Sequence, residues 1–112
     1  MIAADSSSFI AHLSGAEGED VDILDRALSD RLVVLPPVVL FELLSDPKLS
    51  SPVSELLKLL PVLETDEGYW ERAGALRAKA LSKGRKARLA DTLIAQSCLD
   101  HGIPLIVRDR VG

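Results

Sequence analysis

The chain has 112 residues and a formal net charge of −4, with 47% hydrophobic but only 4% aromatic residues. This composition excludes a disordered chain and predicts an aliphatic core. The single cysteine excludes a disulfide framework and argues against a zinc site of the cysteine–histidine type. The length fits one domain over residues 1–112. No apolar run approaches the about 20 residues of a membrane span, and the N-terminus lacks a basic leader. We therefore expect a soluble, cytoplasmic protein with no membrane contact.

Short apolar segments alternate with amphipathic helices along the chain. In order, the pattern predicts a strand at residues 1–4, helices at 9–13 and 19–30, a strand at 32–35, helices at 38–45 and 50–60, a strand stub at 62–63, a helix at 66–81, a basic loop at 82–86, a helix at 89–100 and a strand at 104–107. The serines after Asp5 are expected to cap the first helix. Strands that are apolar throughout and alternate with helices predict a parallel sheet covered on both faces.

Four carboxylates are expected at one edge of this sheet. Asp5 follows the first strand, Glu42 lies in the helix after the second, Asp91 opens the helix after the basic loop, and Asp109 follows the last strand. Ligands of open parallel sheets bind at the carboxyl ends of the strands. Like charges gathered there need neutralisation, and oxygen ligands favour Mg²⁺ or Mn²⁺. Glu42 lies in so apolar a segment that an unpaired charge there is expected to be costly.

Positive charge is concentrated just before Asp91. Seven of the 13 basic residues lie between residues 72 and 88, a stretch with no Asp or Glu. Such a stretch is often only a solvated surface. Beside an acidic metal pocket, it also suits the backbone of a nucleic acid, and Arg85, Lys86 and Arg88 lie nearest the pocket. Together these features suggest a metal-dependent nuclease.

Asp5-Ser6-Ser7 after the first strand, Glu42 in LPPVVLFELL and the segment LADTLIAQSCLDHGIPLIVRD resemble the PIN-domain family, and within it the toxin ribonucleases of VapC type. The resemblance implies a PIN-like three-layer α/β/α sandwich with a short central parallel sheet. The four acids of the family fall on Asp5, Glu42, Asp91 and Asp109. Two features depart from the family: Val107 replaces a common Thr or Ser, and the C-terminal strand is apparently missing.

The function implied by this resemblance is metal-assisted hydrolysis of single-stranded RNA, leaving a 5′-phosphate and a 3′-hydroxyl. The four acids would hold one or two Mg²⁺ or Mn²⁺ ions and form the catalytic site. The resemblance also implies an antitoxin protein partner and a homodimer. The apolar positions of helices 19–30 and 50–60 are expected to be core, with a dimer or antitoxin surface as the alternative.

Other interpretations stay open on the sequence alone. Asp5 can be a helix cap, and Asp91 can simply complement a helix dipole. His12, His101 and Cys98 are expected to be structural, and Tyr69 and Trp70 to be packing anchors, with Trp70 on the apolar face of its helix. The alternative function is a catalytically weak PIN-like module that binds RNA or protein. A phosphoacceptor domain of receiver type fits less well, because serines rather than a second acid follow Asp5.

Overall fold

The computed structural model of the chain describes residues 1–108. Its elements in chain order are β1 (Ala3–Ala4), α1 (Ser6–Leu13), α2 (Glu19–Ser29), α3 (Pro37–Leu44), α4 (Ser51–Leu59), α5 (Tyr69–Ser82), α6 (Leu89–His101) and β2 (Leu105–Ile106). Every predicted helix is present within a few residues of its expected bounds. In the described part of the chain, no helix is both long enough and apolar enough to cross a membrane.

The sheet is parallel, as predicted, but its hydrogen-bonded ladder is short. β1 and β2 pair through Ala3 with Leu105 and Ala4 with Ile106. The predicted strands at 32–35 and 62–63 contribute single parallel bridges instead of full strands. Those bridges join Ile2 to Val33 and Leu35 to Val62. The four apolar segments therefore lie in the spatial order 62, 33–35, 2–4 and 105–106, which places the carboxyl ends of β1 and β2 side by side.

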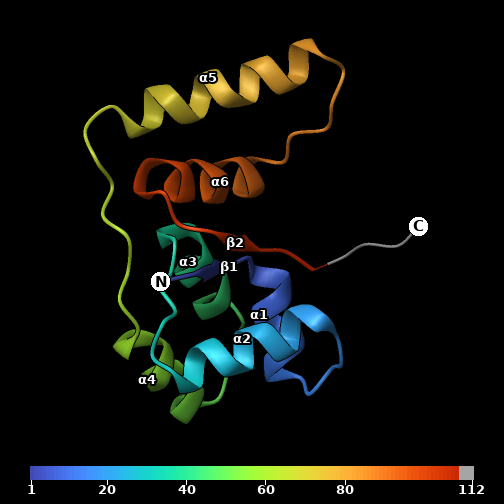
Figure 1. The fold of residues 1–112 in the computed structure, drawn as a ribbon, viewed down its shortest axis with the longest axis vertical. Helices are drawn as coiled ribbons and strands as arrows, with labels where there is room; N and C mark the ends of the chain where they lie inside the picture. The colour runs from blue at the N-terminus through green and yellow to red at the C-terminus, as the bar shows by residue number, and fades with distance from the viewer. Residues whose placement is uncertain (109–112) are drawn as a thin grey trace.

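Helices cover both sides of this sheet. Figure 1 shows α6 and α5 stacked on one side of β1 and β2, with α1, α2 and α4 on the other. The helix α3 packs against both α6 and α1. This arrangement confirms the predicted three-layer α/β/α sandwich with a short central parallel sheet.

The core is aliphatic, as the composition predicts. Ala4, Leu24, Leu35 and Val39 are fully buried, and Phe9 is the aromatic side chain that packs among them. Phe9 enters this core because α1 begins one residue after the buried strand β1. The buried side of the helix includes Ser8 and Phe9. The position of Asp5 is therefore fixed by a buried strand before it and a buried helix face after it.

The first helix begins differently from the sequence prediction. The serines were expected to cap it, but Asp5 is the N-cap and Ser6 is the first helical residue. The Asp5 carboxylate accepts a bond from the backbone nitrogen of Ser8, at 2.9 Å. An aspartate caps a helix as well as a serine does, and its charge also complements the positive end of the helix dipole. The capping interpretation of Asp5 is thus correct.

Tyr69 of α5 packs against α6 and is hydrogen-bonded to it. Its side chain is buried, and its hydroxyl donates to the Leu93 carbonyl at 2.7 Å. Trp70 is 65% exposed, so the prediction that Tyr69 is a packing anchor is correct and the prediction for Trp70 is wrong. Consecutive helical residues point about 100° apart, so only one of the two rings can face α6.

An ion pair adds to this helix pair. Arg72 on α5 holds both oxygens of the Asp100 carboxylate on α6, at 2.9 Å through Nε and 2.7 Å through Nη2. Arg72 and a hydrogen bond from Gln96 lower the pKa of Asp100 below its usual 3.8. A carboxyl whose pKa is lowered by folding stabilises the fold above its usual pKa, and this contribution is lost as the pH falls through the folded-state pKa.

We therefore expect Asp100→Asn to lower the urea midpoint of unfolding at neutral pH. The difference from the wild type should shrink as the pH falls from 3.8 through the lower folded-state pKa of Asp100, because the wild-type carboxyl then becomes protonated too. Circular dichroism during urea unfolding measures the midpoint, and Asp22→Asn, at an exposed acid of α2, is the matched control. A difference that persists undiminished in acid would contradict this assignment.

Candidate functional site

The candidate site lies where β1 and β2 end. Asp5 follows β1, and its carboxylate oxygen Oδ1 accepts both the Ser8 backbone nitrogen and the Ser7 hydroxyl, each at 2.9 Å. Two donors on one oxygen fix the orientation of the carboxylate. Its rigid placement follows from the cap described above and suits a group that must hold a ligand in one geometry.

Asp91 reaches the same place from another element. It is an exposed residue in the first turn of α6, the helix that lies beside β1 and β2 on the same side as α5. Asp5 and Asp91 line one cavity of about 270 Å³, together with Ile94, Leu105, Val107 and Arg108. The structure thus brings together two of the four predicted acids, although they lie 86 positions apart in the sequence.

Glu42 lies on α3 and is exposed, so the expected cost of burying its charge does not arise. The apolar residues around it in the sequence point elsewhere because successive side chains of a helix face different directions. Its Oε1 accepts the Ser6 hydroxyl at 2.6 Å, which connects it to the residue after Asp5. Glu42 lines a separate depression with residues of α1 and α4 rather than the Asp5–Asp91 cavity.

The fourth predicted acid, Asp109, lies outside the described residues. Within residues 1–108, no three His, Cys, Asp or Glu side chains gather closely enough to form a metal site by themselves. The two carboxylates in the cavity nevertheless fit a hard cation, because Mg²⁺ in proteins is commonly bound through one or two carboxylates, with waters and substrate phosphates completing the shell. The donor chemistry of Asp5 and Asp91 is therefore suitable for Mg²⁺ or Mn²⁺.

Two residues of this region were missed by the sequence reasoning. Arg108 lines the cavity, and its Nη1 lies 3.3 Å from the Asp20 carboxylate at the start of α2. Burial alone would raise the pKa of Asp20, but hydrogen bonds from Ser8 and the Val21 backbone, with the Arg108 charge, lower it below the usual value. Asp20 stands among several acids of an amphipathic helix, so nothing in the sequence distinguishes it. Arg108 was identifiable only by its place beside Asp109.

The basic side chains between residues 72 and 88 fall into two groups, those hydrogen-bonded within the fold and those exposed on the loop. Arg72 is held by Asp100, and Arg77 donates through Nε to the Ala87 carbonyl at 2.9 Å. Arg85, Lys86 and Arg88 are exposed on the loop between α5 and α6. Lys86, Arg88 and Asp91 line one open depression between these helices. Positive charge therefore leads directly to one of the two carboxylates.

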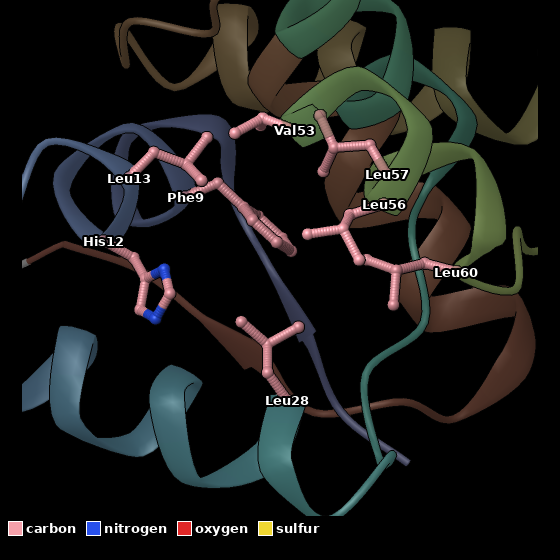
Figure 2. Close-up of a pocket in the computed structure, with 8 residues that line it drawn as sticks. All are labelled: Phe9, His12, Leu13, Leu28, Val53, Leu56, Leu57 and Leu60. Carbon is pink, nitrogen blue, oxygen red and sulfur yellow. The ribbon is translucent and has the colours of Figure 1, made fainter. Parts of the chain in front are cut away.

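A second cavity, away from the carboxylates, is apolar. It lies between α1, α2 and α4, has a volume of about 270 Å³ and is lined by Phe9, His12, Leu13, Leu28, Val53, Leu56, Leu57 and Leu60 (Figure 2). Leu56 is 64% exposed at its rim. His12 is fixed by Asp25 of α2, with Nε2 2.9 Å from the carboxylate. The predicted structural role of His12 is consistent with this contact.

The remaining candidates have structural surroundings. His101 is bonded through Nε2 to the Glu64 carbonyl at 2.8 Å, and Gly102 ends α6 in a left-handed conformation that glycine adopts without strain. Cys98 is buried, and burial raises the pKa of its thiol. A buried thiol with a raised pKa is a poor nucleophile, so Cys98 belongs to the core.

Comparisons with known proteins identify the fold. The sequence matches the profile of the PIN domain over residues 2–111. The structure of VapBC2 from Rickettsia felis bound to a DNA fragment from their promoter is similar, with a TM-score of 0.72, 17% sequence identity and coverage of 97% of this chain and 100% of that one. The structure of FitAB bound to the IR36 DNA fragment is also similar, with a TM-score of 0.67, 20% identity and coverage of 94% and 82%. No curated protein matches the sequence. The predicted resemblance is thus confirmed over almost the whole chain, which belongs to the PIN-domain family.

Proposed function

We propose that this PIN domain is a metal-dependent endoribonuclease, the toxin of a VapBC-type toxin–antitoxin pair, and that it hydrolyses phosphodiester bonds of single-stranded RNA. The observation that carries the proposal is the cavity in which Asp5 and Asp91 meet, beside exposed cations. PIN domains are typically nucleases, and the similar VapBC2 and FitAB structures support the toxin class.

The residues have distinct roles in this proposal. Asp5 and Asp91 hold the divalent ion, with Glu42 and Asp109 as the further acids of the site. Mg²⁺ or Mn²⁺, when bound, neutralises charge on the scissile phosphate and activates water for attack. Ser7 and Ser8 fix the Asp5 carboxylate, so it does not have to reorganise when substrate binds. Water adds to phosphorus, the bond to the 3′ oxygen breaks, and the products are a 5′-phosphate and a 3′-hydroxyl.

RNA would approach along the loop between α5 and α6. Arg85, Lys86 and Arg88 are exposed there, and the last two share a depression with Asp91. Cations on such a path attract the phosphate backbone without reading its sequence. The negative net charge of the whole chain makes this local concentration the natural place for an RNA contact.

The antitoxin would dock over the apolar cavity between α1, α2 and α4. Its lining includes the exposed Leu13 of α1 and Leu56 of α4, and apolar surface of this kind is typical of a protein-binding site. Other exposed apolar side chains, among them Phe41 and Trp70, supply area for the proposed homodimer. A toxin of this class acts on RNA in the cytoplasm.

The test is cleavage of a labelled single-stranded RNA by the purified protein. We expect cleavage with Mg²⁺ or Mn²⁺, no cleavage in EDTA, and recovery when the metal is restored. The products should carry 5′-phosphates. A folded protein that binds the RNA but never cuts it, with either metal, would contradict the enzyme assignment.

That outcome would favour a second candidate, a catalytically weak PIN-like module that binds RNA or protein. Two observations support this alternative. Only two of the four family acids line the cavity within the described residues, and Val107 lines it where the family commonly has a hydroxyl. A binding module would retain metal-independent RNA affinity.

A further inference from the structure

Arg108 stands beside the two carboxylates without being paired to either. It lies two residues after β2 and lines the cavity with Asp5 and Asp91. Among the ion pairs of residues 1–108, its partner is Asp20. A guanidinium that only neutralised the acidic cavity would be expected to pair with the cavity's own acids. Because Arg108 pairs with Asp20 instead, the Asp5 and Asp91 carboxylates are left available to a metal ion.

The contacts of Arg108 hold it from one side. Nη1 lies 3.4 Å from Oδ1 and 3.3 Å from Oδ2 of Asp20, and Nη2 donates to the Glu17 carbonyl at 3.1 Å. The Asp20 side chain is only 9% exposed, while that of Arg108 is 33% exposed. The anchoring carboxylate is therefore largely covered, and the cation itself remains accessible from the cavity.

The anchor shares its framework with the first candidate metal ligand. The Ser8 hydroxyl donates to Oδ2 of Asp20 at 2.9 Å, while the Ser8 backbone nitrogen donates to Asp5. One buried serine in the first turn of α1 thus orients both the Asp5 carboxylate and the anchor of Arg108. The distance between the cation and the carboxylate cavity is consequently fixed by the same turn of helix.

We propose that Arg108 contacts a non-bridging phosphate oxygen of the bound RNA next to the scissile bond, and that Asp20 is the residue that positions it. This inference rests on the proposed nuclease function. Arginine suits the role because its planar guanidinium binds phosphate through several donors and stays charged at any working pH. Asp20 already restrains the Arg108 side chain, so less conformational entropy is lost when Arg108 binds phosphate.

The experiment compares Arg108→Gln, Arg108→Lys and Asp20→Asn with the wild type. Arg72→Gln is the matched control, because it breaks another arginine–aspartate pair that does not line the cavity. Two assays are made: the kinetics of metal-dependent cleavage, which give kcat and KM, and the binding of a labelled oligouridylate in EDTA over a range of salt, which gives the affinity and its salt slope. The salt dependence separates a phosphate contact from a structural effect, since each contact to a single strand contributes about 0.7 to the slope. Thermal unfolding verifies that each variant is folded.

We expect Arg108→Gln to weaken oligouridylate binding about tenfold and to lower the salt slope by about 0.7. Arg108→Lys should keep the slope while losing part of the affinity. Asp20→Asn should also keep the slope, because the cation remains, but should bind less tightly. Arg72→Gln should match the wild type in both the affinity for the oligouridylate and the salt slope.

The inference is overturned if Arg108→Gln keeps the wild-type slope, or if Arg72→Gln lowers it equally. Wild-type protein that does not bind the oligouridylate would overturn it as well. Failure of the proposed function gives a different result. The wild type would then not cleave RNA with any metal, while the binding difference between Arg108→Gln and Arg72→Gln would persist in EDTA.

Discussion

Asp5→Asn and Asp91→Asn are each expected to reduce metal-dependent RNA cleavage by about 100-fold or more. A metal ion acting on a phosphoryl oxygen supplies several kcal/mol of transition-state stabilisation, and each 1.36 kcal/mol corresponds to about tenfold in rate. An amide has no charge with which to hold that ion. Both residues line the same cavity, so the loss of either carboxylate leaves a single acid among the described residues that line it.

The asparagine substitution separates catalysis from folding at Asp5. Asparagine is as good an N-cap as aspartate, and its amide oxygen can still accept the bonds from Ser7 and Ser8. The thermal midpoint of Asp5→Asn should therefore stay near that of the wild type. Initial rates of RNA cleavage at several Mn²⁺ concentrations measure the effect, with Asp22→Asn as the control at an exposed acid. Cleavage at the wild-type rate in both cavity variants would refute the site.

Leu35→Ala is expected to lower the free energy of unfolding by about 2–5 kcal/mol. Leu35 is fully buried, and its backbone also forms the bridge to Val62. Removing its side chain deletes apolar contacts and leaves a cavity that the surrounding sheet and helices fill only in part. The free energy of unfolding of small domains is about 5–15 kcal/mol in total, so this single change should remove a large fraction of it.

The matched control for this prediction is Leu59→Ala on α4. Leu59 is 79% exposed, so the same chemical change there should alter the free energy of unfolding by about 0.5 kcal/mol or less. Urea unfolding followed by circular dichroism gives both values. Equal effects at the two positions would show that Leu35 does not have the buried place assigned to it.

The order of helices and strands was predictable because the chain marks its own boundaries. Apolar runs fall between glycines and prolines, as at Pro36-Pro37, where α3 begins, and at Gly102 after α6. The length of the strands was not predictable. The segment at 32–35 is as apolar as any in the chain, but its partners allow only single bridges at Val33 and Leu35. Pairing depends on the neighbouring segment, which the local sequence does not contain.

The candidate site was predictable to the extent that it depends on topology. Asp5 follows β1 and Asp91 opens α6, the helix that precedes β2, so both line the cavity at the edge where the parallel strands end. The surroundings of Glu42 were wrongly inferred, since its neighbours in the sequence are apolar but its neighbour in space is the Ser6 hydroxyl. The pairing of Arg108 with Asp20 spans 88 positions and has no local signal at all. Long-range polar contacts of this kind require the folded structure.

The pairing of β1 with β2 sets an order of events during translation. Ala4 is synthesised long before its partner Ile106, so the two residues can pair only after the whole segment between them has been made. Contacts between such distant residues form late, after the local helices. A nascent or interrupted chain therefore carries Asp5 without the strand that completes the cavity around it. The proposed nuclease activity is therefore expected only after β2 has been synthesised and has paired with β1.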